Sequence, residues 1–195
     1  KMKKILLLAA IILTANLTQA QWQQTNGPNG GAVYCLAVSD TNIFAGTIPD
    51  GVFLSTDSST SWSAVNTGIY NYSSGIYCLA VIGTNIFAAN NYGVFLSTNY
   101  GTSWSGASTG ISGGVISLAV IGTNLFAGTG YNGVFLSTNN GTSWLQKNNG
   151  LTNNTITSFG VNGSNIFAGT GDGKVFLSTN NGTSCSDIVC SACPL

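Results

Sequence analysis

The sequence predicts an all-β fold, a β-propeller whose blades are four-stranded antiparallel sheets of about 41 residues each. The first observation is a repeat, since the segment VFLST begins four times at spacings of 42, 40 and 41 residues. The second is that every repeat holds four short β-type runs joined by hairpin-length connections. The third is that no window beyond the leader has helical periodicity. About four blades are therefore present, as a complete propeller or as a fragment of a larger one.

The second repeat illustrates the expected strands, which cover residues 76–81, 85–89, 93–98 and 103–108. One such sheet alone would leave both of its apolar faces in water. Stacking the repeats face to face around a common axis buries Val, Leu and Phe side chains between neighbouring blades. The need for mutual burial explains why the chain repeats itself.

The chain divides into a leader, the repeats and a tail. Residues 1–20 have the basic start, apolar run and small terminal residues of a secretory signal peptide. The repeats occupy 21–184, with blades at about 29–70, 71–111, 112–152 and 153–184. Residues 21–28 resemble a fourth strand and are expected to close the propeller by completing the last blade. The aberrant tail is 185–195.

The alternative is that the chain is a truncated piece of a larger propeller. Unpaired strand edges and apolar faces would then be open, and the chain is expected to self-associate through them. The tail contains Cys185, Cys190 and Cys193, whose pairing the spacing does not decide. Cys35 and Cys78 occupy equivalent repeat positions, where the other two copies have serine, and are expected to be small residues on a packed strand.

An eight-residue segment between the third and fourth strands, here called the octet turn, recurs in every copy (STNNGTSW in the third). Its third residue is a short polar side chain that can bond nearby backbone N–H groups, and its fifth is usually glycine, which allows a positive φ. In the first three copies the segment ends in a tryptophan, which is expected to start the fourth strand and pack under the turn, and the fourth copy has Cys185 there. The expected turn residues are Asp57, Asn99, Gly101, Asn139, Gly141, Asn180, Gly182, Trp62, Trp104 and Trp144. Ser59 replaces glycine in the first copy, so that turn should be strained or differently formed.

The pattern S-x-[DN]-x-G-x-[ST]-W resembles the Asp-box, or BNR, repeat of sialidases, xyloglucan-active glycosidases, sortilin-type receptors and the photosystem II assembly factor. The resemblance covers all four copies. It implies a β-propeller in which the box is a structural turn remote from any active site. It does not by itself imply a particular activity.

The residue types exclude most chemistry. The chain has no Arg, Glu or His, so the arginine triad and Tyr–Glu pair of sialidases and any Ser or Cys catalytic triad are absent. From residue 21 onward two lysines face five aspartates, which makes binding of nucleic acid or anionic lipid unfavourable. Asp50 and Asp172 lie in comparable loops and are expected to be polar turn residues. A calcium ion at Asp172 is a secondary reading, and we otherwise expect no metal, no cofactor and no enzyme activity.

One face of the predicted propeller varies between copies, and tyrosines gather on it. The loops joining second to third strands and one blade to the next carry Tyr70, Tyr72, Tyr92 and Tyr131. Exposed tyrosine rings suit sugar rings or peptides. We therefore expect a secreted, non-catalytic binding or scaffold module for a glycan or an extracellular protein, outside the cell, on its surface or in the periplasm. The alternatives are a remnant of an Asp-box glycoside hydrolase and a structural segment of a larger adhesion protein.

Overall fold

The computed structural model describes residues 22–184 and 186–187. The predicted signal peptide and the three tail cysteines lie outside these residues. The described chain forms four sheets of four strands each, in which every strand pairs antiparallel with its sequence neighbours. This confirms the all-β prediction with four four-stranded repeats.

Each sheet is one blade, numbered in chain order. Blade 1 is β1 (Ala32–Ser39), β2 (Asn42–Ile48), β3 (Gly51–Ser55) and β4 (Ser63–Ala64). Blade 2 is β5 (Cys78–Ile82), β6 (Asn85–Asn90), β7 (Gly93–Ser97) and β8 (Ser105–Gly106), preceded by the 3-10 helix η1 (Tyr72–Ser74). Blade 3 is β9 (Val115–Ile121), β10 (Asn124–Thr129), β11 (Val134–Ser137) and β12 (Leu145–Gln146). Blade 4 is β13 (Ile156–Asn162), β14 (Asn165–Thr170), β15 (Val175–Ser178) and β16 (Ser186–Asp187).

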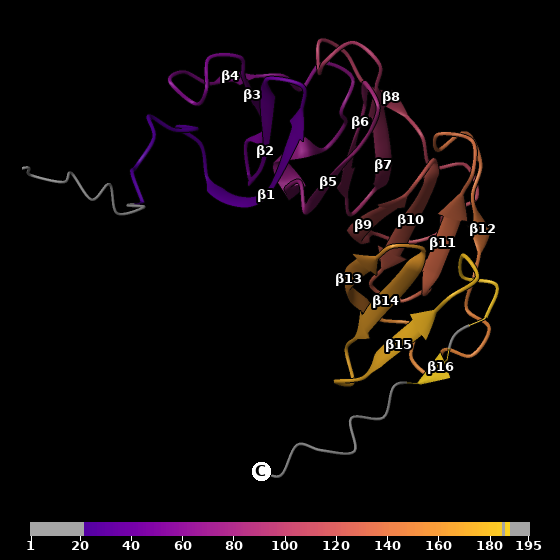
Figure 1. Cartoon of the computed structure of the whole chain (residues 1–195). Coiled ribbons are helices and arrows are strands. Elements are labelled where there is room, and N and C mark those ends of the chain that lie inside the picture. Colours follow the sequence, from indigo (N-terminus) through magenta and orange to yellow (C-terminus); the bar gives the residue numbers. More distant parts are fainter. Residues whose placement is uncertain (1–21, 185, 188–195) are drawn as a thin grey trace, which may run out of the picture.

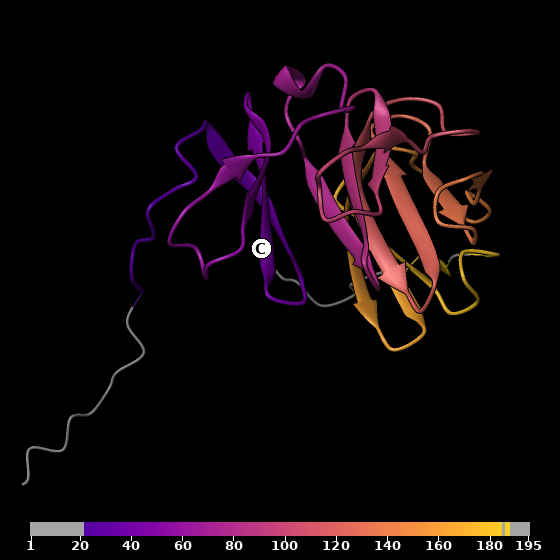
Figure 2. The ribbon, with the colours of Figure 1, turned by 90° about the horizontal axis from the view of Figure 1, so that it is seen from above.

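The blades follow one another along an open arc, as Figure 1 shows, with β1, β5, β9 and β13 along its inner side. The view from above in Figure 2 shows the same stack from another direction. Consecutive blades pack face to face, and the arc does not close between blade 1 and blade 4. Each blade therefore has an N-side face, toward the preceding blade, and a C-side face, toward the following one.

The core consists of three apolar clusters, one in each space between blades. Between blades 1 and 2, Phe44 and Val52 of the first meet Ile76, Ile86 and Phe95 of the second. The space between blades 2 and 3 is filled by the equivalent residues one repeat later, and the space between blades 3 and 4 holds the third cluster. Burial between repeats, as the sequence predicted, is what holds the stack together.

The two cysteines of the described core lie on C-side faces. Cys35 is half-buried and Cys78 is buried, and both are free thiols. Burial raises the pKa of the Cys35 thiol to about 12 and raises that of Cys78 well above its ordinary value. A Cβ added at Gly46 would lie 2.4 Å from the Cys35 sulfur, so this strand pair has room only for small residues. The position is thus a packing position, as expected.

The fourth strands differ from the prediction. In blade 2 the expected strand 103–108 is reduced to Ser105–Gly106. Trp104 does not start it, because its backbone N–H donates to the Thr67 carbonyl in blade 1 at 2.8 Å instead of joining its own sheet. The other fourth strands are equally short.

The predicted closing strand at 21–28 is not part of the last sheet. Residues 22–28 form no strand, and β16 supplies the fourth strand of blade 4. Their place is the N-side of blade 1, where the Asn26 amide donates to the Thr60 carbonyl at 3.4 Å. The reason is geometric, since the open arc leaves blade 4 away from the N-terminal residues.

Candidate functional site

The octet turn is held by its own side chains. In blade 2 the Ser97 hydroxyl donates to Oδ1 of Asn99 at 2.9 Å and accepts the Gly101 N–H at 2.8 Å. The same Asn99 oxygen accepts the Ser103 N–H at 2.9 Å. Three donors of one turn thus bond to two acceptors, the Ser97 hydroxyl and Asn99 Oδ1. Blades 3 and 4 repeat this network around Asn139 and Asn180. These bonds close the turn, as the sequence predicted for the short polar residue.

Blade 1 has aspartate in place of asparagine and keeps the same turn. Asp57 accepts from the Ser55 hydroxyl, the Ser61 N–H and the Ser61 hydroxyl at 2.9, 2.9 and 2.6 Å. Ser59, in the glycine position, donates its N–H to the Ser55 hydroxyl at 2.9 Å and adopts a φ of +67°. The turn of blade 1 is therefore strained, as expected for a non-glycine residue at positive φ, and it is not differently formed.

Glycine in the later turns serves a second purpose, close contact with the preceding blade. A Cβ added at Gly101 would lie 3.2 Å from Phe44 and Val65 of blade 1, and one at Gly141 would lie 3.1 Å from the Ala107 Cβ of blade 2. The octet turn of each blade from the second onward thus docks on the blade before it. Ser59 holds the corresponding position in blade 1, whose turn docks on no other blade among the described residues.

The tryptophans complete this docking instead of packing under their own turns. The indole N–H of Trp104 donates to the Val65 carbonyl, and that of Trp144 to the Ala107 carbonyl, both at 2.7 Å. Both rings are buried. The tryptophans of the octet turns therefore bond blades 2 and 3 to the blade before each.

Acid should weaken the turn of blade 1 specifically. Hydrogen bonds from Ser61, and next from Ser55, lower the pKa of Asp57 from 3.8 to about 2. The stabilisation from the ionised carboxylate is fully present above the ordinary pKa and is lost as pH falls through the folded value. We expect Asp57→Asn, which copies the residue of the other blades, to reduce the loss of stability between neutral pH and pH about 2. Urea unfolding at both pH values measures this difference, and an identical pH dependence in both proteins would refute it.

The predicted tyrosines do not form one cluster. Tyr70 and Tyr92 contact each other edge to face with ring centroids 6.0 Å apart, and Tyr70 also packs on Phe95 at 4.9 Å. Tyr72 lies exposed on η1. Tyr131 is the most exposed of the four, at 84%. The structure therefore pairs Tyr70 with Tyr92 and leaves Tyr131 to another site.

That site is a groove of about 230 Å³ lined mainly by apolar surface. Its lining is uncharged and comes from blades 2 and 3 and the connection to blade 4: Asn91, Gly114, Ile116, Gly130, Tyr131 and Thr155. We call it the rim groove. A planar ring, an aliphatic side chain and an amide thus surround one hollow, which is the mixture that binds a ring with both apolar and hydroxyl surfaces.

The sequence analysis did not identify Ile116, which lines the rim groove, or Tyr77, which bonds one of its lining residues. β1, β9 and β13 each have a register shift near their start. The residue left out of the strand pairing is Tyr34 in β1, Ile116 in β9 and Thr157 in β13. Tyr77 holds the equivalent place, and its ring meets Tyr34 edge to face at 6.3 Å. A β-bulge redirects such a side chain, and simple alternation of the sequence does not reveal it. Tyr77 also positions the groove, because its hydroxyl accepts from the Asn91 amide at 3.0 Å.

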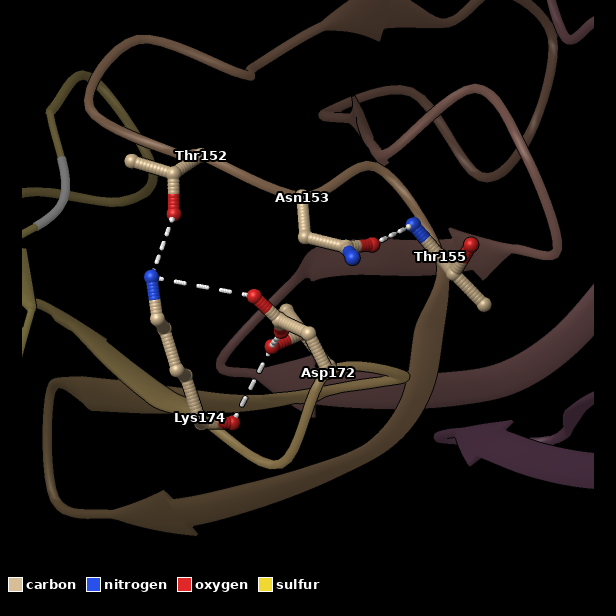
Figure 3. Close-up of polar contacts among 6 residues, drawn as sticks. Thr152, Asn153, Thr155, Asp172 and Lys174 are labelled. Carbon is tan, nitrogen blue, oxygen red and sulfur yellow. Dashed lines mark hydrogen bonds and ion pairs between the residues drawn. The ribbon is translucent and has the colours of Figure 1, made fainter.

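The carboxylates considered for chemistry are used in local bonds. Asp172 forms an ion pair with Lys174 at 3.7 Å, and the Lys174 ammonium also donates to the Thr152 hydroxyl, as Figure 3 shows. Asp50 accepts the Gly31 N–H at 2.8 Å. Among residues 22–184, 186 and 187 no three His, Cys, Asp or Glu side chains gather as metal ligands would.

The described part of the chain contains no helix with the length and apolar character needed to cross a membrane.

Comparison with known proteins rests on structure. No family model matches the sequence, and no curated protein matches it. Among solved structures, an ancestral GH74 enzyme superposes with a TM-score of 0.68 at 22% identity, over 88% of this chain and 26% of that one. The extracellular domain of BT4673 from B. thetaiotaomicron gives 0.70 at 21% identity, over 88% and 23%. YCF48 from Cyanidioschyzon merolae gives 0.67 at 14% identity, over 86% and 59%.

These neighbours are β-propeller proteins, and the likeness supports a propeller fold for this chain. The chain spans about a quarter of the GH74 enzyme and BT4673 chains and somewhat more than half of YCF48.

Proposed function

We propose that this chain is an exported, non-catalytic propeller module that binds a neutral glycan in the rim groove. The observation that carries the proposal is the uncharged groove that the exposed Tyr131 and Asn91 both line. Sugar rings stack on aromatic faces through their C–H surfaces and use hydroxyls to bond amides and carbonyls. Export is supported by the leader at 1–20 and by the extracellular setting of one structural neighbour.

A glycoside hydrolase remnant is the less favoured function. Hydrolysis of a glycosidic bond requires two facing carboxylates, one of them free to donate a proton. Here Asp50 and Asp172 lie on the first and last blades of an open arc, and Asp172 is neutralised by Lys174. We therefore expect no turnover of chromogenic glycosides. A structural role within a larger adhesion protein is compatible with the fold but assigns no purpose to the rim groove.

Binding is tested by isothermal titration calorimetry with neutral oligosaccharides selected on a glycan array. Tyr131→Ala should raise the Kd about tenfold, the equivalent of about 1.4 kcal/mol, because it removes the stacking surface. Tyr72→Ala is the matched control, since this tyrosine is also exposed but does not line the groove. Equal affinity of wild type and Tyr131→Ala, or binding of peptides with no glycan retained, would contradict the proposal.

A further inference from the structure

The N-side face of blade 1 is built like an internal blade face but is exposed. Val33, Leu36 and Val38 are 47%, 63% and 61% exposed. The equivalent residues of blade 2 are Ile76, Leu79 and Val81, which pack into the cluster shared with blade 1. Those of blade 3 pack against blade 2 in the same way. Blade 1 therefore presents the surface that every other blade uses to meet its predecessor.

Polar groups on this face also lack the partner that a preceding blade supplies. The Trp62 indole nitrogen is buried without a hydrogen-bond partner among the described residues, whereas Trp104 and Trp144 each donate to a carbonyl of the blade before. A buried donor left unpaired is unfavourable. The Asn26 amide bonds the Thr60 carbonyl, much as the Asn149 amide of blade 3 bonds the Thr183 carbonyl of blade 4. The turn of blade 1 thus already carries part of the contact made by a preceding blade.

The C-side face of blade 4 has the complementary form. Its inner strand places the small Ser158 and Gly160 where blade 1 has Cys35 and Ala37. Val175, which corresponds to the fully buried Val52 and Val94, is 43% exposed. At each of the first two internal interfaces, small residues of one inner strand meet larger apolar residues of the next inner strand. The two ends of the arc are therefore the two halves of one such interface.

We infer that a second copy of this chain covers both ends, with blade 1 of each copy packed on blade 4 of the other. With the four blades described in each copy, two such contacts close a ring of eight blades, which is within the usual range for propellers. A head-to-tail contact must either close into a ring or continue into a fibre. The arc favours closure, because its two ends border the same open side in Figure 1. The end-face residues named above are all uncharged.

The experiment measures the mass of the purified chain by native mass spectrometry and by light scattering after gel filtration. Wild type should be a dimer. Leu36→Asp should raise the dimer dissociation constant more than tenfold, because it would bury a charge at the new interface. Leu145→Asp is the matched control, since Leu145 is similarly exposed, at 68%, but lies on the outer strand of a middle blade.

Val175→Asp tests the opposite end and should dissociate the dimer equally, which keeps the proposal testable if Leu36→Asp fails to fold. Circular dichroism establishes that each variant is folded. A monomeric wild type, a polydisperse series of larger species, or a dimer that survives both end-face variants would each overturn the inference. Loss of the dimer in Leu145→Asp would overturn it as well.

Discussion

Replacing Trp104 with alanine should lower the free energy of unfolding by about 3–5 kcal/mol, the usual cost of deleting a large buried aromatic side chain. The ring is 6% exposed and lies in the cluster between blades 1 and 2. Its indole N–H also donates to the Val65 carbonyl, so the substitution removes the polar bond between the blades as well. Urea unfolding followed by far-UV circular dichroism measures the change.

Trp104→Phe separates the two contributions. Phenylalanine keeps most of the apolar contact but leaves the Val65 carbonyl without its donor, so we expect a loss of about 1–3 kcal/mol. A loss below about 1 kcal/mol for Trp104→Ala would mean that the ring is not packed between blades.

The second large effect is expected at Gly141. Its φ of +79° costs a non-glycine residue about 1–2 kcal/mol. An added methyl group would also lie 3.1 Å from the Ala107 Cβ of the preceding blade, and overpacking of this kind costs about 1–3 kcal/mol more. Gly141→Ala should therefore destabilise the protein by about 2–5 kcal/mol, measured by the same urea unfolding.

Gly83→Ala is the matched control for this substitution. Gly83 also has a positive φ, +59°, but a Cβ there would meet nothing within 4 Å. It should show the backbone cost alone, about 1–2 kcal/mol. Equal losses at Gly83 and Gly141 would show that the octet turn does not dock on the blade before it.

The sequence predicted the repeat, the strand order and the turn chemistry because these depend on local patterns. Alternating apolar residues place each strand, and the Asn99 side chain closes its turn wherever the blade lies. The destination of Trp104 was beyond this reasoning. A tryptophan after a turn can pack on its own sheet or on a neighbour, and only the spacing of adjacent blades decides between them.

The candidate site was predictable in part for a related reason. Tyr131 was found because a tyrosine in a varying loop is an exposed ring wherever the loop lies. Ile116 was missed because a register shift in β9 redirects it from the face that alternation assigns. Tyr77 was missed because it lies just before β5, outside the alternating strand. The prediction that residues 21–28 complete the last blade was wrong, because β16 is the fourth strand of that sheet. A segment can resemble a fourth strand without its sequence showing which sheet edge it reaches.

The central claim is that blades 2 and 3 are each held to the preceding blade by the tryptophan that ends their octet turn. Hydrogen exchange of the indole N–H groups, followed by NMR, tests it most directly, with the fully exposed Trp22 as the reference. The account predicts that the indole protons of Trp104 and Trp144 exchange far more slowly than that of Trp22, because both are buried in bonds to the preceding blade. Exchange of these two protons as fast as that of Trp22 would contradict it.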